Sequence, residues 1–250
     1  MNSVFVDDNT YLPKIVNMLT TVETEEMKGI EAAAKAAYTS ICNGGLLHVF
    51  SCGHSHMIVD EMFYRAGGLV PVNPILDSQL MMHEGAIQST LNERKTGKAR
   101  EVLSKANLKA GDTIIVSSNT GINNVPIEAA IYAKEKGLTV IVITSISASK
   151  MLEANNESGK RLYDLGDIVI DNHVPFGDGL LTIPENGQTT GGASTFSSLF
   201  IAQRIVLKIE NLYLAEGRIP PVYMSANVPN GTEHNDILIK KYENKIAALR

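Results

Sequence analysis

The chain has little cysteine and no long apolar run, and these absences exclude several kinds of protein. Its two cysteines, Cys42 and Cys52, do not have the spacing of a metal-binding pair. We expect both to be buried free thiols. No apolar run approaches the roughly 20 residues that a membrane-spanning helix needs. Residues 1–10 carry acidic side chains and no apolar signal core, so the expected location is cytoplasmic, with no membrane partner.

Excess positive charge and nucleotide-binding signatures are also missing. The chain has 22 Lys and Arg against 27 Asp and Glu, a net charge of −5, and no basic stripe. This balance argues against a nucleic-acid partner. There is no glycine-rich Walker loop and no three-glycine dinucleotide turn, and the second predicted strand ends in Asn73-Pro74 rather than in an acid. NAD and ATP are therefore poor candidates, and we expect no cofactor.

Five short apolar runs predict a parallel β-sheet. They are residues 46–50, 69–72, 113–116, 139–143 and 167–170. Four of the runs are continuous rather than alternating, which is typical of strands that are covered on both faces. The second contains Pro71, which favours an edge position. Because helical stretches separate the runs, the sequence predicts a doubly wound α/β fold.

Helices are predicted at both ends of the chain as well as between the strands. A long helix is expected over residues 11–43 and another over 191–216. Shorter helices are expected over 57–66, 126–136, 147–154 and 235–249. The segment 74–109 is long for a single crossover. We interpret it as one or two helices that cover the site or serve an interface.

Two polar turns follow the first and third predicted strands. They read Gly53-His54-Ser55 and Ser117-Ser118-Asn119-Thr120-Gly121-Ile122-Asn123. Hydroxyls, amides and glycine at a strand-to-helix turn form an anion pocket, because a helix start offers free N–H groups and a favourable dipole. If the sheet order is 2-1-3-4-5, both turns flank the switch point where such folds bind ligands. Either turn alone could consist only of helix caps, but the pair favours a phosphorylated ligand.

These turns resemble the phosphosugar loops of the sugar isomerase (SIS) domain family. Residues 118–123 are similar to its Ser-x-Ser-Gly-x-Ser/Thr loop, with Thr120 in place of the second serine and Asn123 where a hydroxyl residue often stands. Residues 53–55 match the family's Gly-x-Ser loop. The segments 63–68, 171–178 and 220–235 resemble the SIS subgroup called UPF0309.

The resemblance implies a three-layer αβα sandwich with a five-stranded parallel sheet and at least a homodimer. It suggests an N-terminal helical extension (1–30), a SIS domain (31–215) and a C-terminal tail and helix (216–250). It also implies a phosphorylated sugar or amino sugar as ligand. The expected contacts are Gly53, His54, Ser55, Ser117, Ser118, Asn119, Thr120 and Asn123. Since the family includes isomerases, an etherase, a synthase domain and non-enzymatic sensors, the loops do not fix the reaction.

Aldose–ketose isomerisation needs a base that moves a proton between adjacent carbons and an acid that serves the carbonyl oxygen. Glu61 follows Ser55 by two helical turns, and Glu84 stands beside His83 in the long crossover. His173 follows the fifth strand, and His234 is a candidate to complete the site of a partner subunit. Glu61, Glu84, His173 and His234 are our catalytic candidates, each weighed against an ordinary structural role.

Histidine also raises the question of a metal. His54 and His56 flank Ser55, and one of them is a candidate ligand contact. A zinc site could draw on these two with His83 and His173, but only the flanking pair has a recognisable spacing, so we expect no metal. The function expected is a sugar-phosphate aldose–ketose isomerase. The alternatives are a non-catalytic sugar-phosphate sensor, or a lyase or etherase acting on an N-acetylated sugar phosphate.

Overall fold

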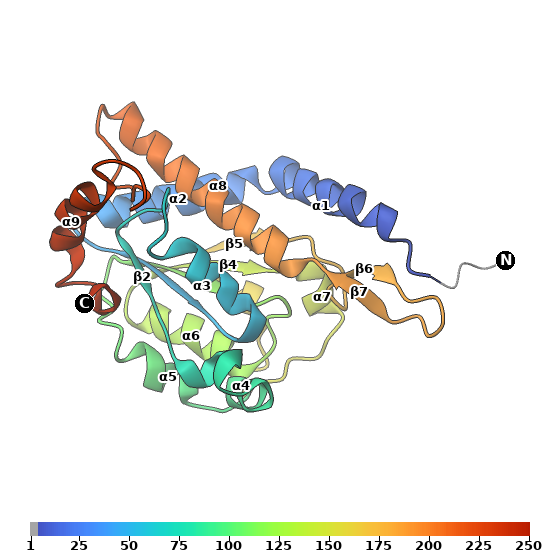
Figure 1. Cartoon of the computed structure of the whole chain (residues 1–250). Helices are drawn as coiled ribbons and strands as arrows, with labels where there is room; N and C mark the ends of the chain where they lie inside the picture. The colour runs from blue at the N-terminus through green and yellow to red at the C-terminus, as the bar shows by residue number, and fades with distance from the viewer. Residues whose placement is uncertain (1–4) are drawn as a thin grey trace.

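A parallel five-stranded sheet forms the centre of the computed structural model, which describes residues 5–250 (Figure 1). Its strands are β1 (Leu47–Ser51), β2 (Val72–Pro74), β3 (Thr113–Ser117), β4 (Thr139–Thr144) and β5 (Ile168–Asp171). They are ordered β2-β1-β3-β4-β5, and every neighbouring pair is parallel. The predicted fold class and strand order are therefore confirmed. The first four residues of the expected N-terminal extension lie outside the described part.

Helices cover both faces of the sheet. On one face lie α1 (Tyr11–Glu25), α2 (Met27–Cys42), α3 (Met57–Met62) and α8 (Ser194–Ala215) (Figure 1). On the other lie α4 (Ala86–Glu93), α5 (Lys98–Leu103) and α6 (Asn124–Glu135). Successive residues of one strand enter different cores, with Ile141 against α2 and α8 and Val142 against α5 and α6. Because both faces are buried, the strands read as continuous apolar runs.

The long N-terminal helix that we predicted is broken into two. Between α1 and α2 stands Glu26, whose backbone leaves the helical region. Its carboxylate accepts a hydrogen bond from the backbone N–H of Asp171 at 3.1 Å and lies 3.1 Å from His173 Nε2. The break thus lets Glu26 contact the end of β5, a tertiary interaction that helical periodicity does not contain.

The second strand lies at the sheet edge as predicted but begins three residues later. Leu69 forms an antiparallel bridge with Val222, and the N–H of Val70 donates to Pro221 O. These residues therefore pair with the C-terminal tail, and β2 starts only at Val72.

Other elements differ from the prediction in their bounds. The crossover contains α4 and α5 preceded by two 3₁₀ turns (Ser78–Leu80 and Met82–Glu84). The hairpin β6 (Gly179–Thr182) with β7 (Thr189–Gly192) was not predicted. The remaining helices are α7 (Ile146–Lys150) and α9 (Gly231–Tyr242), with a 3₁₀ turn at Ala247–Leu249. Within residues 5–250, no helix combines the length and apolar character that crossing a bilayer requires.

Of the two cysteines, Cys52 is buried as expected, whereas Cys42 is exposed. Cys42 occupies the last position of α2, and its Sγ accepts a hydrogen bond from Arg218 Nη1 at 3.1 Å. The expectation that both thiols are buried is therefore wrong for Cys42, because the helix ends there at the surface.

Candidate functional site

The two polar turns leave adjacent strands at the carboxyl edge of the sheet. Ser51, at the end of β1, is in register with Ser117, at the end of β3. The hydroxyl of Ser51 donates to the backbone O of Ser117 at 2.6 Å, which joins the two strand ends. The turns 52–56 and 118–123 therefore start side by side at the switch point of the sheet.

The first turn depends on a left-handed glycine. Gly53 has a φ of +54°, after which a short 3₁₀ turn (Gly53–His56) runs directly into α3. Ser55 is half-buried and lines a small cavity between this turn and the start of α8, which contributes Ser194 and Ser198. His54 is exposed, with its Nδ1 3.3 Å from Met82 Sδ.

The second turn closes on itself. Ser118 Oγ accepts a hydrogen bond from the N–H of Gly121 at 3.2 Å, and Gly121 has a φ of +60°. A Cβ at Gly121 would lie 2.8 Å from Leu162 Cβ, so the close approach also requires glycine. Thr120 is half-buried, and within residues 5–250 no hydrogen bond engages its hydroxyl. Thr120 is thus available to contact a ligand.

The other expected contacts of the second turn already have structural partners. Ser117 is buried in β3, and its carbonyl accepts the Ser51 hydroxyl. Asn119 Oδ1 accepts a hydrogen bond from Asn172 Nδ2 at 3.0 Å, which directs this amide toward the end of β5. Asn123 is the N-cap residue of α6, but its side chain does not cap the helix. It bonds outward, to Glu93 and to Asn155.

Glu93 is a candidate site residue that the sequence did not predict. It ends α4, and its Oε1 accepts a hydrogen bond from Asn123 Nδ2 at 3.1 Å. Its Oε2 lies 4.0 Å from where a Cβ on Gly53 would stand, so one carboxylate lies near both turns. Burial raises the pKa of Glu93, although the Asn123 hydrogen bond and Arg94 oppose the shift. The only sequence signal was a charged run, 92–95, in a crossover that has to pass this edge.

Glu61 lies further along the contact between α3 and α8. Gln203 Nε2 of α8 donates to Glu61 Oε1 at 2.6 Å, and Arg65 contacts the same oxygen. Residues one turn earlier on each helix, Ile58 and Leu199, line the cavity that contains Ser55. Glu61 is therefore held about one turn behind that cavity, with an amide that fixes its orientation.

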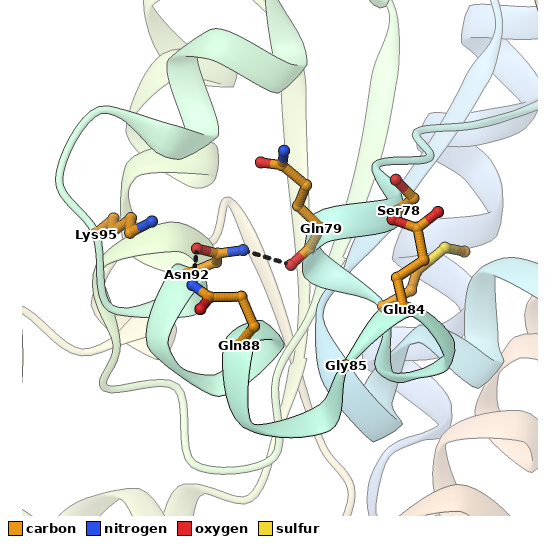
Figure 2. A pocket seen from close by; sticks show the side chains of 8 residues that line it. Ser78, Gln79, Glu84, Gly85, Gln88, Asn92 and Lys95 are labelled. Carbon is orange, nitrogen blue, oxygen red and sulfur yellow. Dashed lines mark hydrogen bonds between the residues drawn. The ribbon is translucent and has the colours of Figure 1, made fainter.

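The crossover places Glu84 and His83 in different cavities. Glu84 lines a polar pocket of about 290 Å³ in which Asn92 links Gln88 to the backbone of Gln79, as Figure 2 shows. His83 lines another cavity, together with Gly53 and His56. The two side chains therefore do not form the acid–imidazole pair that their adjacency suggested.

His173 and His234 are anchored away from the two turns. His173 lies beyond β5, where its Nε2 is 3.1 Å from Glu26 Oε1. The Nε2 of His234, on α9, is 3.0 Å from the backbone O of Val222. Just beyond α9, Lys245 bonds Gly44 O, next to the amino end of β1, so α9 lies at the opposite edge (Figure 1). Within residues 5–250, no group of three or more His, Cys, Asp or Glu is arranged to hold a metal ion.

Comparison with known proteins identifies the family. A model described as SIS domain matches residues 10–145, which include both turns. UPF0309 protein lin2794 of Listeria innocua is 40% identical over 241 residues, covering 96% of this chain and 98% of the relative. UPF0309 protein TTE0306 of Caldanaerobacter subterraneus is 38% identical, with the same coverage of both chains.

Solved structures share the fold at low sequence identity. A phosphoheptose isomerase from Neisseria gonorrhoeae superposes with a TM-score of 0.52 and 14% identity, covering 80% of this chain and 96% of the other. A phosphoheptose isomerase from Francisella tularensis gives a TM-score of 0.50 and 17% identity over 81% of this chain and 96% of the other. These likenesses extend the fold assignment across the sheet, while the sequence matches define the family. The chain belongs to the SIS domain family and, within it, to the UPF0309 proteins.

Proposed function

We propose that this protein binds a sugar phosphate between the turns 53–55 and 118–123 and interconverts its aldose and ketose forms. The observation that carries the proposal is the pairing of the two turns, fixed by the hydrogen bond from Ser51 to Ser117. The start of α6 and the hydroxyl of Thr120 offer donors to a phosphate. Two solved proteins of the same fold are phosphoheptose isomerases, which adds support from outside the chain.

Glu61 is the base in this proposal, because among the catalytic candidates it alone lies one helical turn from residues that line the cavity containing Ser55, within reach of a ligand that extends past Ile58 and Leu199. Its carboxylate takes the proton from C2 of the open-chain aldose, and the C2–H electrons form the C1=C2 bond of the enediol while the carbonyl π electrons move to O1, which takes a proton from water. The C2 hydroxyl then loses its proton to water as C2=O forms, and Glu61 returns the first proton to C1 to give the ketose. The hydrogen bond from Gln203 holds the carboxylate at one angle along the α3–α8 contact. Glu84 and His173 have no part in this scheme, because they line other cavities.

The proposal includes a homodimer. Exposed apolar side chains on helices of one face of the sheet, among them Val16 of α1 and Leu207 and Leu214 of α8, are the surface we assign to it. Within one chain, His234 lies at the edge of the sheet opposite the two turns. In this proposal, His234 of the partner subunit is the copy that approaches the site. Light scattering after size exclusion measures the mass directly.

The test of binding is a double variant, Ser118→Ala/Thr120→Ala, measured by calorimetry against a panel of hexose and pentose phosphates and their 2-amino forms. The matched control, Thr20→Ala/Ser104→Ala, removes two exposed hydroxyls, one on α1 and one at the residue that follows α5. We expect the site variant to lose at least about tenfold in affinity, as two charge-assisted hydrogen bonds are removed. Equal affinities for wild type and site variant would overturn the binding proposal.

The test of catalysis is turnover of each bound sugar phosphate, followed by NMR in D₂O. We expect solvent deuterium at the carbon that receives the proton. Glu61→Gln should bind as wild type does and reduce kcat by about 10²-fold or more. Binding with no turnover and no deuterium in wild type would replace the isomerase by a sensor. Loss of a substituent beside the new double bond would instead indicate a lyase or etherase.

A further inference from the structure

His56 carries a buried nitrogen with no partner. The residue is 3% exposed, and within residues 5–250 its Nε2 has no hydrogen bond. Its Nδ1 lies 3.3 Å from Asp60 Oδ2, one turn further along the chain. A buried polar atom left unpaired is costly and rare in folded proteins. The arrangement therefore calls for a partner that is supplied from outside the chain.

The chemistry of that partner follows from the tautomer. A carboxylate only accepts hydrogen bonds, so Asp60 fixes the imidazole proton on Nδ1. Burial lowers the pKa of His56, opposed by Asp60 and assisted by His83, the two titratable groups that act on it. The ring is neutral at pH 7, and its Nε2 carries a lone pair. Its missing partner is a hydrogen-bond donor.

The cavity beside His56 adjoins the proposed phosphate site. It has a volume of about 410 Å³ and is lined by Gly53, His56, Met57, Asp60, Met81, Met82 and His83. Gly53 belongs both to this cavity and to the first polar turn. The volume is within the range of small-molecule sites. Three methionines give it an apolar and adaptable wall, which suits the C–H face of a sugar ring. Nε2 is covered in the free protein, so a ligand group reaches it only when one of these flexible side chains moves aside.

We propose that His56, oriented by Asp60, is a specificity-determining residue that accepts a hydrogen bond from a hydroxyl group of the sugar. This inference rests on the proposed function, since it places the sugar in the cavity that begins at the phosphate turn. It adds that a phosphate without a donating hydroxyl on its carbon skeleton leaves Nε2 unpaired and binds weakly.

The main test is His56→Phe, with hexose 6-phosphates and inorganic phosphate as probes. Because the change removes an unpaired polar atom from an apolar surround, we expect the variant to be as stable in urea as wild type, or more so. Its affinity for the hexose phosphates should fall about tenfold, the worth of one well-formed hydrogen bond, while its affinity for inorganic phosphate stays unchanged. A loss of stability, or an equal loss for both probes, would overturn the inference.

Two further measurements examine the tautomer. Nitrogen-15 NMR of His56 should show a bare Nε2 in the free protein. That resonance should shift with a hexose phosphate and remain in place with inorganic phosphate. Asp60→Asn, at a largely exposed side chain, lets an amide donate to Nδ1 and moves the proton to Nε2. It should reproduce the selective loss, whereas His83→Gln in the same cavity should not. An equal loss in His83→Gln contradicts an assignment to His56.

An absent phosphate site and an inactive His56 give different binding results. If no sugar phosphate and no inorganic phosphate binds wild type, the phosphate site itself is wrong and the inference falls with it. A second result is that wild type binds all of them and Ser118→Ala/Thr120→Ala abolishes binding, which supports the phosphate site. If His56→Phe then still prefers hexose phosphates to inorganic phosphate as strongly as wild type does, the role of His56 is refuted.

Discussion

The carboxylate of Glu93 lies where a bound anion would approach the second turn, so removing its charge should strengthen anion binding. In the free protein it accepts the hydrogen bond of Asn123, at the N-terminus of α6. A negative side chain is stabilised at a helix N-terminus for the same reason as a phosphate. We therefore expect Glu93 to compete with the ligand, and Glu93→Gln to bind anions more tightly than wild type.

The magnitude follows from Coulomb's law. Two unit charges about 5 Å apart repel by about 3 kcal/mol at an effective dielectric constant near 20. The raised pKa of Glu93 and the access of solvent to its carboxylate reduce this figure. We expect about 1.4 kcal/mol, which is about tenfold in Kd. The control is Glu135→Gln, which removes the same charge at the other end of α6 and should leave the Kd unchanged.

Sulfate is the probe of choice, because it remains a dianion across the accessible pH range. As the pH rises from 4.5, the ordinary pKa of glutamate, through the raised pKa of Glu93, its carboxylate ionises and wild-type affinity should fall. Glu93→Gln should lack this component, so the difference between the two titration curves isolates Glu93. Ionisation of Glu93 also destabilises the fold over that pH interval, so the variant should be at least as stable at pH 7. Parallel titration curves and equal Kd values would refute the reasoning.

Two further predictions concern the support of the site. Asp112→Ala removes the partner of two buried donors, His48 Nε2 and the N–H of Leu46, and of the part-buried N–H of Lys109. It should lower the free energy of unfolding in urea by about 3 kcal/mol. Burial opposes ionisation of Asp112, but these hydrogen bonds outweigh it and lower its pKa in the folded state. The stability that Asp112 contributes should therefore be present above its pKa in the unfolded chain and be lost as the pH falls through its pKa in the folded protein. Gly121→Ala adds a Cβ to a residue with left-handed backbone that lies close to Leu162. It should lower the free energy of unfolding in urea by about 2 kcal/mol and weaken phosphate binding. A Gly121→Ala protein with wild-type stability and affinity would show that the second turn does not need its observed shape.

The sheet was predictable because its strands are buried on both faces. The residues 140–143 of β4 are buried on both faces of the sheet, so both faces are apolar and the segment is a continuous apolar run in the sequence. Pro71 also indicated the edge correctly, although the residues before it pair with the C-terminal tail. The hairpin β6–β7 could not be predicted, because its strands are short, rich in Gly and Thr, and largely solvent-accessible. Periodicity carries little signal in such segments.

The site was predictable only where it depends on the backbone. Strand ends and left-handed glycines fix the two turns, and both are visible in the sequence. The roles of individual side chains were not visible, because they depend on partners far along the chain. Asn119 is directed by Asn172, Glu61 by Gln203, and His173 by Glu26, a residue from the opposite end of the domain.

The crossover between β2 and β3 accounts for most of what the sequence left open, and this has a consequence for the protein's selectivity. It supplies Glu93 beside the two polar turns, and Met81, Met82 and His83 beside His56. The turns themselves come from the sheet and present groups that any phosphate would accept. Under the proposed function, discrimination among phosphates therefore arises where other side chains meet the rest of the ligand, and the crossover provides most of those side chains. Exchanging residues 74–109 between two UPF0309 proteins should transfer sugar preference while affinity for inorganic phosphate changes little.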